Sequence, residues 1–290
     1  MARPSLMPGS DYLMSTTDQV VPWHQPLLPM WRKAYPSNKP LKRAKILPGT
    51  PLMQQFKLAK ARGSPIVFFG LMTSMTVMTT PRIIKGLYAI TPDCDDTPLL
   101  VAKVTEAVEA GISVLQYRNK VASQHLKMQQ ASLIKDICDQ RKVPFIINDD
   151  VALCDTLDAD GVHLGKDDST IDDVRHILGP DKIIGISCYN DGKRVETMLS
   201  QACDYIALGA CFPSSTKPNA PHASTEFIKK VMTKASKPVV AIGGINLDNC
   251  RSLLNCGVSA IAVVNEIFSS QDITQTVKTF NEILKTYEQK

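Results

Sequence analysis

Short apolar runs recur at regular intervals between residues 86 and 264, and stretches with helical spacing separate them. The runs are continuous rather than alternating, which is typical of strands buried on both faces, as in parallel sheets. We expect strands at residues 86–90, 114–118, 143–148, 161–165, 182–187, 204–209, 237–244 and 259–264. Helices are expected at residues 98–110, 123–140, 151–157, 171–178, 194–201, 225–235, 248–255 and 272–287. The pattern therefore predicts an α/β fold.

Polar residues follow nearly every expected strand, and this decides between two α/β architectures. About eight βα units in roughly 205 residues fit an eight-stranded parallel βα barrel, the TIM barrel. A doubly wound open sheet is the alternative, but it would gather the polar residues near one switch point. Because they are spread over nearly all strand ends, we predict a barrel with these residues around its mouth.

The first 80 residues differ in composition from the rest of the chain. They carry ten Lys or Arg against two acidic residues, ten of the nineteen prolines, and both tryptophans, Trp23 and Trp31. They show no sustained helical or strand period, and proline disrupts both structures. We predict a low-order, basic, Pro-rich extension over residues 1–80 and the barrel domain over residues 81–290. The alternatives are a targeting peptide, or a natural start at Met72, Met75 or Met78.

Composition also limits the partners and the compartment. Residues 81–290 carry 23 basic and 26 acidic residues, which gives no reason to expect nucleic-acid binding. No run of about 18 apolar residues exists, so no membrane-spanning helix is expected. The eight cysteines form no C-x-x-C pair, which disfavours a zinc or redox motif and favours buried free thiols in a reducing cytoplasm. The sequence leaves the oligomeric state open, a homo-oligomer included.

Three polar residues at spacing two end the second expected strand: Gln116, Arg118 and Lys120. On an extended backbone such residues project to the same side. An amide and two cations that face one spot suit a polyanion such as a diphosphate. The alternative is a solvated edge strand with ordinary surface charges.

Two carboxylates follow the third and fourth expected strands, Asp149 and Asp168. Mg²⁺ is usually held by one or two carboxylates together with phosphate oxygens and water. We therefore predict a magnesium site here. In the alternative interpretation, Asp149 caps the next helix and Asp168 caps the helix that starts near Ile171.

A second phosphate site is expected after the later strands. Gly243 and Gly244 follow the seventh strand, where βα barrels commonly bind phosphate, although a tight turn would also explain them. Other polar residues that follow strands are Asn148, Ser187, Ser214, Ser215, Thr216, Lys217 and Asn265. The loop that carries Lys217 could equally be an ordinary surface loop. His163 lies within a strand and receives no role. Two phosphate sites at one mouth predict a transferase with diphosphate as its leaving group.

From about Lys85 to near the C-terminus, the chain resembles the thiamine-phosphate synthases. The motifs that carry the resemblance are GLYAITPD (86–93), Q-x-R-x-K (116–120), IND (147–149), ADGVHLGKDD (159–168), IGIS ending at Ser187, FPSSTK (212–217) and AIGGI (241–245). The resemblance implies a magnesium-dependent step of thiamine biosynthesis. An aminopyrimidine methyl diphosphate loses diphosphate, and the nitrogen of a thiazole phosphate, or of its carboxylated form, attacks the resulting methylene cation.

The resemblance also implies a role for each matching residue. The catalytic residues would be Lys120, Arg118, Lys217 and Ser187. The two phosphorylated substrates would be bound by Gln116, Tyr117, Arg118, Asn119, Lys120, Asn148, Ser187, Ser214, Ser215, Thr216, Lys217, Gly244, Val264 and Asn265. Of these, Ser214, Ser215, Thr216, Gly244, Val264 and Asn265 would hold the thiazole phosphate. Mg²⁺ would be held by Asp149 and Asp168.

The chain departs from the family pattern at four positions. Asp150 stands where an Arg is usual, Tyr189 where a His is common, Ala223 near a usual Gly, and Asn265 where a Ser is usual. The diphosphate set itself is complete. Two other functions remain open at this point: a thiazole tautomerase, and a non-catalytic phosphate-binding relative.

Overall fold

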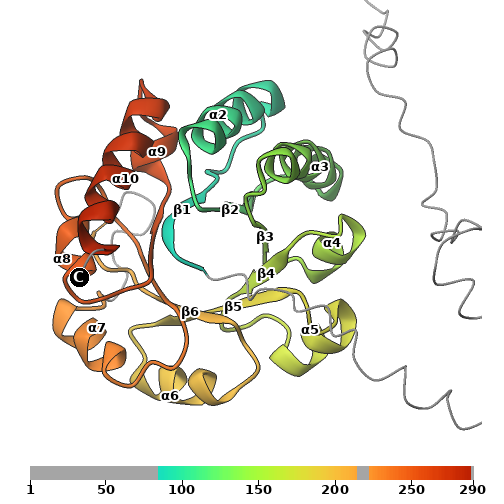
Figure 1. The fold of residues 1–290 in the computed structure, drawn as a ribbon. Coiled ribbons are helices and arrows are strands. Elements are labelled where there is room, and N and C mark those ends of the chain that lie inside the picture. The colour runs from blue at the N-terminus through green and yellow to red at the C-terminus, as the bar shows by residue number, and fades with distance from the viewer. Residues whose placement is uncertain (1–83, 214–221, 289–290) are drawn as a thin grey trace, which may run out of the picture. The chain divides into compact units, whose positions relative to one another are not determined.

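The computed structural model describes residues 84–213 and 222–288, which form a closed barrel of eight parallel strands (Figure 1). The strands are β1 (Gly86–Ile90), β2 (Val114–Tyr117), β3 (Phe145–Asn148), β4 (Gly161–Leu164), β5 (Ile183–Tyr189), β6 (Tyr205–Leu208), β7 (Val239–Ile242) and β8 (Ala260–Val263). Each strand pairs with the next and β8 pairs with β1, which confirms the TIM-barrel prediction. The predicted extension over residues 1–80 and the loop residues Ser214, Ser215, Thr216 and Lys217 lie outside the described residues.

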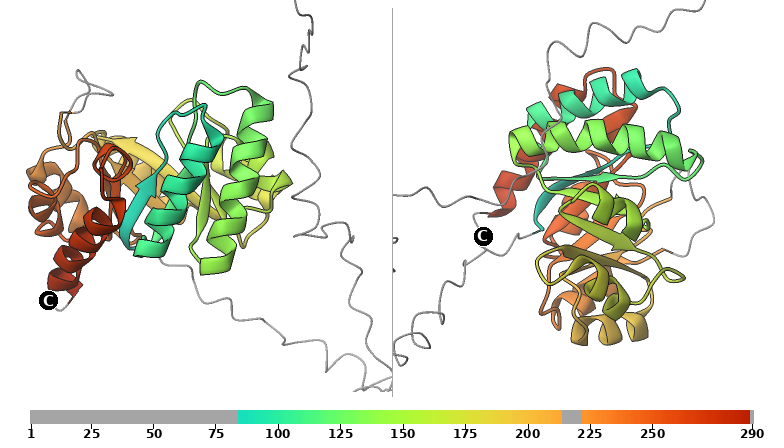
Figure 2. Two further views of the ribbon diagram at one scale, coloured as in Figure 1. Left: turned by 90° about the horizontal axis from the view of Figure 1, so that it is seen from above. Right: turned by 90° about the vertical axis from the view of Figure 1, so that its right-hand side faces the viewer.

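Helices surround the ring of strands (Figure 1). They are α2 (Thr97–Ala110), α3 (Gln124–Arg141), α4 (Val151–Thr156), α5 (Ile171–Leu178), α6 (Gly192–Ser200), α7 (Thr225–Met232), α8 (Cys250–Leu254), α9 (Asn265–Phe268) and α10 (Ile273–Glu288). Helices α2 and α3 lie side by side on the outside of the barrel (Figure 2). The sequence pattern gave no sign of α9, because four residues are too short to show a helical period.

The ends of the helices follow from local side-chain chemistry. The Asp96 side chain accepts a hydrogen bond from the Leu99 N–H group and so caps the first turn of α2. Gly111 ends the same helix in the left-handed conformation with φ of 101°, which glycine adopts without steric cost. Such caps fix where each helix leaves the sheet, and they therefore fix the loops that carry the polar residues.

Residues along each strand alternate between the barrel interior and the layer beneath the helices. Tyr88, Val114 and Ile146 belong to a cluster inside the barrel. Their neighbours Leu87 and Leu115 belong to the larger cluster between strands and helices. Both faces of the strands are thus buried, and this double burial explains the continuous apolar runs in the sequence.

The parallel barrel has two chemically different ends. We call the loops that follow the strands the mouth, and the segments that lead into the strands the base. All the described residues that were predicted to bind substrate or metal lie in the loops of the mouth or near the end of a strand that leads into it. All eight cysteines are free, and seven of them are buried, as the sequence predicted. No helix in the described part of the chain is long and apolar enough to cross a membrane.

Candidate active site

Two carboxylates lie close together at the mouth, after β3 and β4. Asp149 directly follows β3, and its N–H group donates to the carbonyl of His163 on β4 at 2.8 Å. Its φ of 63° lies in the left-handed region, which is unusual for a non-glycine residue. Asp168 lies in the loop after β4, where its carboxylate accepts the Gly165 N–H group at 2.5 Å. The fold therefore brings together the two aspartates that the sequence predicted as metal ligands.

The interpretation of these aspartates as helix caps is wrong. Asp150, not Asp149, caps α4, because its side chain accepts a hydrogen bond from the Leu153 N–H group at 2.9 Å. Thr170, not Asp168, caps α5. Neither carboxylate at the mouth therefore caps a helix.

The electrostatics of this pair suit a divalent cation. Burial raises the pKa of Asp149, and hydrogen bonding and repulsion from Asp168 raise it further. The Lys120 ammonium lies 3.4 Å from the Asp149 carboxylate and lowers this pKa without offsetting the increase. Among the described residues, no group of three or more His, Cys, Asp or Glu side chains could hold a metal. Two carboxylates that leave other positions to water and phosphate fit Mg²⁺ better than a closed protein cage.

Gln116, Arg118 and Lys120 reach three different partners. Strand β2 ends at Tyr117, so Arg118 and Lys120 lie on the following loop rather than on an extended strand. The Gln116 amide donates to the hydroxyl of Tyr88 inside the barrel at 2.9 Å. The Arg118 guanidinium pairs with Asp93, which follows β1, at 3.0 Å. Lys120 instead turns toward β3 and Asp149, so the two cations flank the mouth from opposite sides of β2.

Tyr117 and Asn119 point away from the barrel interior. The Tyr117 hydroxyl donates to the Gln130 side chain on α3 at 2.8 Å, and the Asn119 amide donates to the Cys94 carbonyl at 2.6 Å. Both residues are buried. They also line, together with Lys120, a pocket of about 170 Å³ whose other walls are Lys127, Ile147, Asn148, Asp149, Asp150 and Leu153. Their role in substrate binding stays a prediction, and their side chains join the mouth to α3.

Ser187 and His163 form a hydrogen-bonded pair on the inner face of β4 and β5. His163 Nε2 lies 2.9 Å from Ser187 Oγ, and His163 Nδ1 lies 2.9 Å from the hydroxyl of Tyr205 on β6. Burial lowers the pKa of His163 to about 4, so the ring is neutral at physiological pH. The sequence analysis assigned His163 no role and did not single out Tyr88 or Tyr205. Their signal was a polar group inside an apolar strand, on the same face as Gln116 or Ser187.

The glycine pair after β7 is required by close backbone packing. Gly244 has φ of 63°, and a Cβ atom there would lie 2.4 Å from the carbonyl oxygen of Pro213. A Cβ atom at Gly243 would lie 2.7 Å from Ala210. The segment after β6 therefore packs directly on this turn. Val264 and Asn265 start α9 at the adjacent strand end.

The structure shows where the four residues that depart from the family pattern lie. Asp150 caps α4, as described above. Tyr189 ends β5 beside an irregularity in the β5–β6 pairing, with φ of 56° and its side chain exposed. Ala223 is buried and its N–H group donates to the Ala210 carbonyl at 2.8 Å. Asn265 is the first residue of α9. The charged groups that shift the pKa of Asp149 are Asp168 and Lys120, and Asp150 is not among them.

Comparison with known proteins connects this geometry to one family. A sequence model of the family described as thiamine monophosphate synthase matches residues 87–267. The thiamine-phosphate synthase of Methylobacillus flagellatus is 48% identical over 210 residues, which cover 72% of this chain and 99% of that protein. The enzyme of the same name from Azoarcus sp. is 41% identical, over 69% of this chain and 97% of that protein.

A solved structure gives the same result. The thiamine phosphate pyrophosphorylase from Pyrococcus furiosus superposes with a TM-score of 0.64 and 30% sequence identity, covering 71% of this chain and 98% of that one. The match spans nearly the whole of that enzyme. The chain belongs to the thiamine monophosphate synthase family.

Proposed function

We propose that the barrel is a thiamine-phosphate synthase. It joins 4-amino-2-methyl-5-(diphosphooxymethyl)pyrimidine to 4-methyl-5-(2-phosphoethyl)thiazole, or its carboxylated form, and releases diphosphate. The observation that carries this proposal is the identity of 48% over 99% of the length of a relative with that name. The pair of carboxylates with a lysine at the mouth supports it, because a diphosphate leaving group needs cations at that place.

The reaction breaks one C–O bond and forms one C–N bond. The bond between the pyrimidine methylene and the diphosphate oxygen breaks, and both electrons leave with the diphosphate. The lone pair of the thiazole nitrogen then fills the vacancy on the methylene carbon. With the uncarboxylated thiazole phosphate no proton transfer is needed, whereas the carboxylated form must also release CO2 and take up one proton at the carbon that carried it. In both cases the protein must stabilise the charge on the leaving group and orient two substrates.

The residues around the carboxylate pair are suited to hold the leaving group. Asp149 and Asp168 would hold Mg²⁺, which neutralises charge that develops on the diphosphate. Lys120 already faces Asp149, and Arg118 approaches the same end of the barrel from β2, so both can donate charge-assisted hydrogen bonds to phosphate oxygens. We assign Ser187 and Lys217 to the same anion, and Gln116 and Asn148 to the pyrimidine. Tyr117 and Asn119 support this wall of the mouth.

We assign the acceptor phosphate to the opposite side of the mouth. Gly244, Val264 and Asn265 follow β7 and β8, where the backbone N–H groups of βα barrels commonly bind phosphate. Ser214, Ser215 and Thr216 would complete this site. A phosphate bound there would direct the thiazole ring toward the pyrimidine methylene, and it would keep the two substrates in one orientation.

Formation of thiamine phosphate is the direct test. The full-length protein is incubated with both phosphorylated substrates, either with Mg²⁺ or with EDTA. We expect product only with Mg²⁺. Lys120→Ala should lower kcat/KM by about a hundredfold, since a charge-assisted contact to the leaving group is lost. Lys278→Ala removes an exposed lysine on α10 and should change kcat/KM less than about twofold.

The negative outcomes of this test have distinct meanings. A folded protein that makes no product, but interconverts the carboxylated thiazole phosphates, would be a tautomerase. A folded protein with neither activity that still binds phosphate would be a binding protein. Product formation that is equal in Mg²⁺ and EDTA would exclude the assignment of Asp149 and Asp168 to a metal.

A further inference from the structure

A row of hydrogen-bonded side chains crosses the barrel interior from β2 to β5. The Gln116 amide donates to Tyr88 at 2.9 Å, and the Tyr88 hydroxyl lies 2.8 Å from the Tyr205 hydroxyl. Tyr205 lies 2.9 Å from His163 Nδ1, and His163 Nε2 lies 2.9 Å from Ser187 Oγ. Strands β1 and β6 are not neighbours in the sheet, so the contact between the two tyrosines spans the barrel. We call these five residues the relay.

The relay is buried and its space is built for it. Tyr88, Tyr205, Gln116 and His163 are all buried. A Cβ atom at Gly185 would lie 2.0 Å from Cζ of Tyr205, so only glycine leaves room for that ring. The Tyr205 ring also stacks on His163 with centroids 5.5 Å apart. In the described part of the chain, no buried side-chain polar atom lacks a hydrogen-bond partner.

The chemistry at one end sets the direction of every bond along the row. The nitrogen of the Gln116 amide can only donate, so the Tyr88 oxygen accepts from it. Among the described residues, the remaining partner of Tyr88 is Tyr205, so the Tyr88 proton goes to the Tyr205 oxygen. The Tyr205 proton then goes to His163 Nδ1, which must be unprotonated. The reverse direction would leave the buried Tyr88 proton without an acceptor.

The direction has a consequence for Ser187 at the mouth. A neutral imidazole that accepts at Nδ1 carries its proton on Nε2, and this proton is donated to Ser187 Oγ. The serine proton is then left to point away from His163. If the hydrogen bonds ran in the opposite direction, the Ser187 hydroxyl would donate to His163 Nε2, and only its lone pairs would face a bound anion.

We propose that Tyr88, Tyr205 and His163 are positioning residues that fix the Ser187 hydroxyl as a hydrogen-bond donor to the anionic part of the substrate. The same row connects Ser187 on β5 to Gln116 on β2 through the barrel interior. The identity of the anion as the pyrimidine diphosphate rests on the proposed function. The direction of the relay does not, because it follows from the protein's own hydrogen bonds.

The tautomer of His163 tests the direction without any substrate. ¹⁵N-histidine is incorporated into the full-length protein, and the ring signals of the five histidines are recorded, with His163→Gln used to assign them. We expect His163 to show a protonated Nε2 and an unprotonated Nδ1. A protonated Nδ1, or protons on both nitrogens, would overturn the proposal whatever the enzyme does.

Kinetics test the consequence for Ser187. Tyr205→Phe removes the proton that Nδ1 accepts and should raise the KM for the diphosphate substrate about tenfold, with the KM for the thiazole phosphate unchanged. In a Ser187→Ala background the same change should have no further effect on KM. His163→Gln, whose amide can still donate to Ser187, should retain more activity than His163→Ala. Ser259→Ala removes a hydroxyl that accepts the Val239 N–H group at the base, and it should leave both KM values unchanged.

The outcomes separate the relay from the proposed function. An unaltered KM in a folded Tyr205→Phe variant, or an equal further loss in the Ser187→Ala background, would overturn the positioning role. Absence of synthase activity together with the expected tautomer would leave the relay standing and overturn only the identity of the anion.

Discussion

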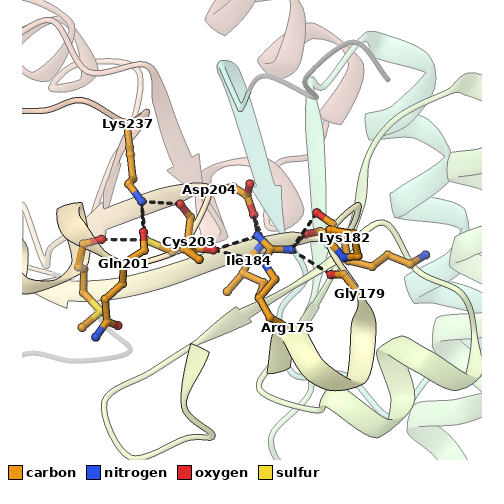
Figure 3. A network of polar contacts seen from close by, with 11 residues as sticks. Arg175, Gly179, Lys182, Ile184, Gln201, Cys203, Asp204 and Lys237 are labelled. Atoms are coloured by element: carbon orange, nitrogen blue, oxygen red, sulfur yellow. Dashed lines mark hydrogen bonds and ion pairs between the residues drawn. The ribbon is translucent and has the colours of Figure 1, made fainter. Parts of the chain in front are cut away.

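The base and the mouth of the barrel differ in how fully their charged side chains are hydrogen-bonded. At the base, the Arg175 guanidinium on α5 donates to the carbonyls of Gly179, Lys182 and Ala202 and to the Asp204 carboxylate (Figure 3). These groups lie where the chain leaves α5 and where it enters β5 and β6. One side chain thus ties two incoming strands together with bonds to groups that the fold itself fixes.

At the mouth, charged side chains lie close together but have fewer hydrogen-bond partners than Arg175 has at the base. Asp149 and Asp168 lie side by side, and the Lys120 side chain that approaches them is 57% exposed. The backbone at Asp149 is also in a left-handed conformation that costs free energy for a non-glycine residue. The comparison indicates that the base is arranged for stability, and that the mouth retains a repulsion between carboxylates which a bound cation would relieve.

The largest expected effect is on activity, and it tests whether Asp149 at the mouth serves the reaction rather than stability. Asp149→Asn should lower kcat/KM by about a hundredfold or more, since a bound metal contributes several kcal/mol to stabilising a leaving group. The same change should not lower the free energy of unfolding of the metal-free protein, because asparagine tolerates the left-handed backbone and one of two repelling charges is gone. Enzyme assays and thermal unfolding in EDTA measure both quantities. An inactive variant that is also clearly less stable would place Asp149 with the structural residues.

The next effect concerns stability. Arg175→Ala should lower the free energy of unfolding by about 3 kcal/mol, because several carbonyls and the Asp204 carboxylate lose their partner. For a domain of this size that is roughly 6–12 °C in Tm. Arg175→Lys should lie in between, since an ammonium cannot reproduce the planar fork. Arg251→Ala, at an exposed position of α8, serves as the control. Loss of kcat/KM in folded Arg175→Ala would show that the base also serves the reaction.

Much of this division could be read from the sequence, because it depends on local pattern. The apolar runs predicted every strand, with β1 matching at both ends, and the order of strands and polar residues predicted that Asp149 and Asp168 lie at the same end of the barrel. Side chains along β2 alternate between two faces, and the site residues assigned from the family resemblance did not take this alternation into account. Residues 116–120 were all assigned to substrate, yet Gln116 faces the interior and Tyr117 faces α3. Consecutive residues of a strand cannot share a face.

The relay could not be predicted, because its contacts depend on closure of the barrel. Tyr88 and Tyr205 are 117 positions apart and belong to strands that do not pair. Alternation tells which face a residue occupies, but the partner across the interior depends on strand tilt and on the room that Gly185 leaves. Arg175 was missed for a similar reason, since most of its partners are backbone carbonyls, which carry no sequence signal, and Asp204 lies 29 positions away.

A smaller effect concerns the pH dependence of stability. The pKa of Asp149 is raised in the folded protein, so its contribution to stability is full below the ordinary Asp pKa and is lost as pH rises through the raised value. Asp149→Asn removes this loss. We therefore expect the Tm of the variant in EDTA to rise relative to that of the wild type as the pH increases from the ordinary Asp pKa through the raised value. Added Mg²⁺ should raise the Tm of the wild type only. A Tm difference that is constant with pH would contradict the raised pKa.

The smallest effect tests where the structural part of the mouth begins. One oxygen of the Asp150 carboxylate accepts a hydrogen bond from the Leu153 N–H group, so this oxygen caps α4. Asp150→Asn keeps this cap and should change Tm by about 1 °C or less and kcat/KM by less than about threefold, whereas Asp150→Ala should lose about 1 kcal/mol of stability. The Mg²⁺ concentration for half-maximal activity is the sensitive measurement. If Asp150→Asn raised this Mg²⁺ concentration tenfold, the Asp150 carboxylate would belong to the metal site. The residues that serve the reaction would then extend from Asp149 to Asp150, and α4 would begin directly after them.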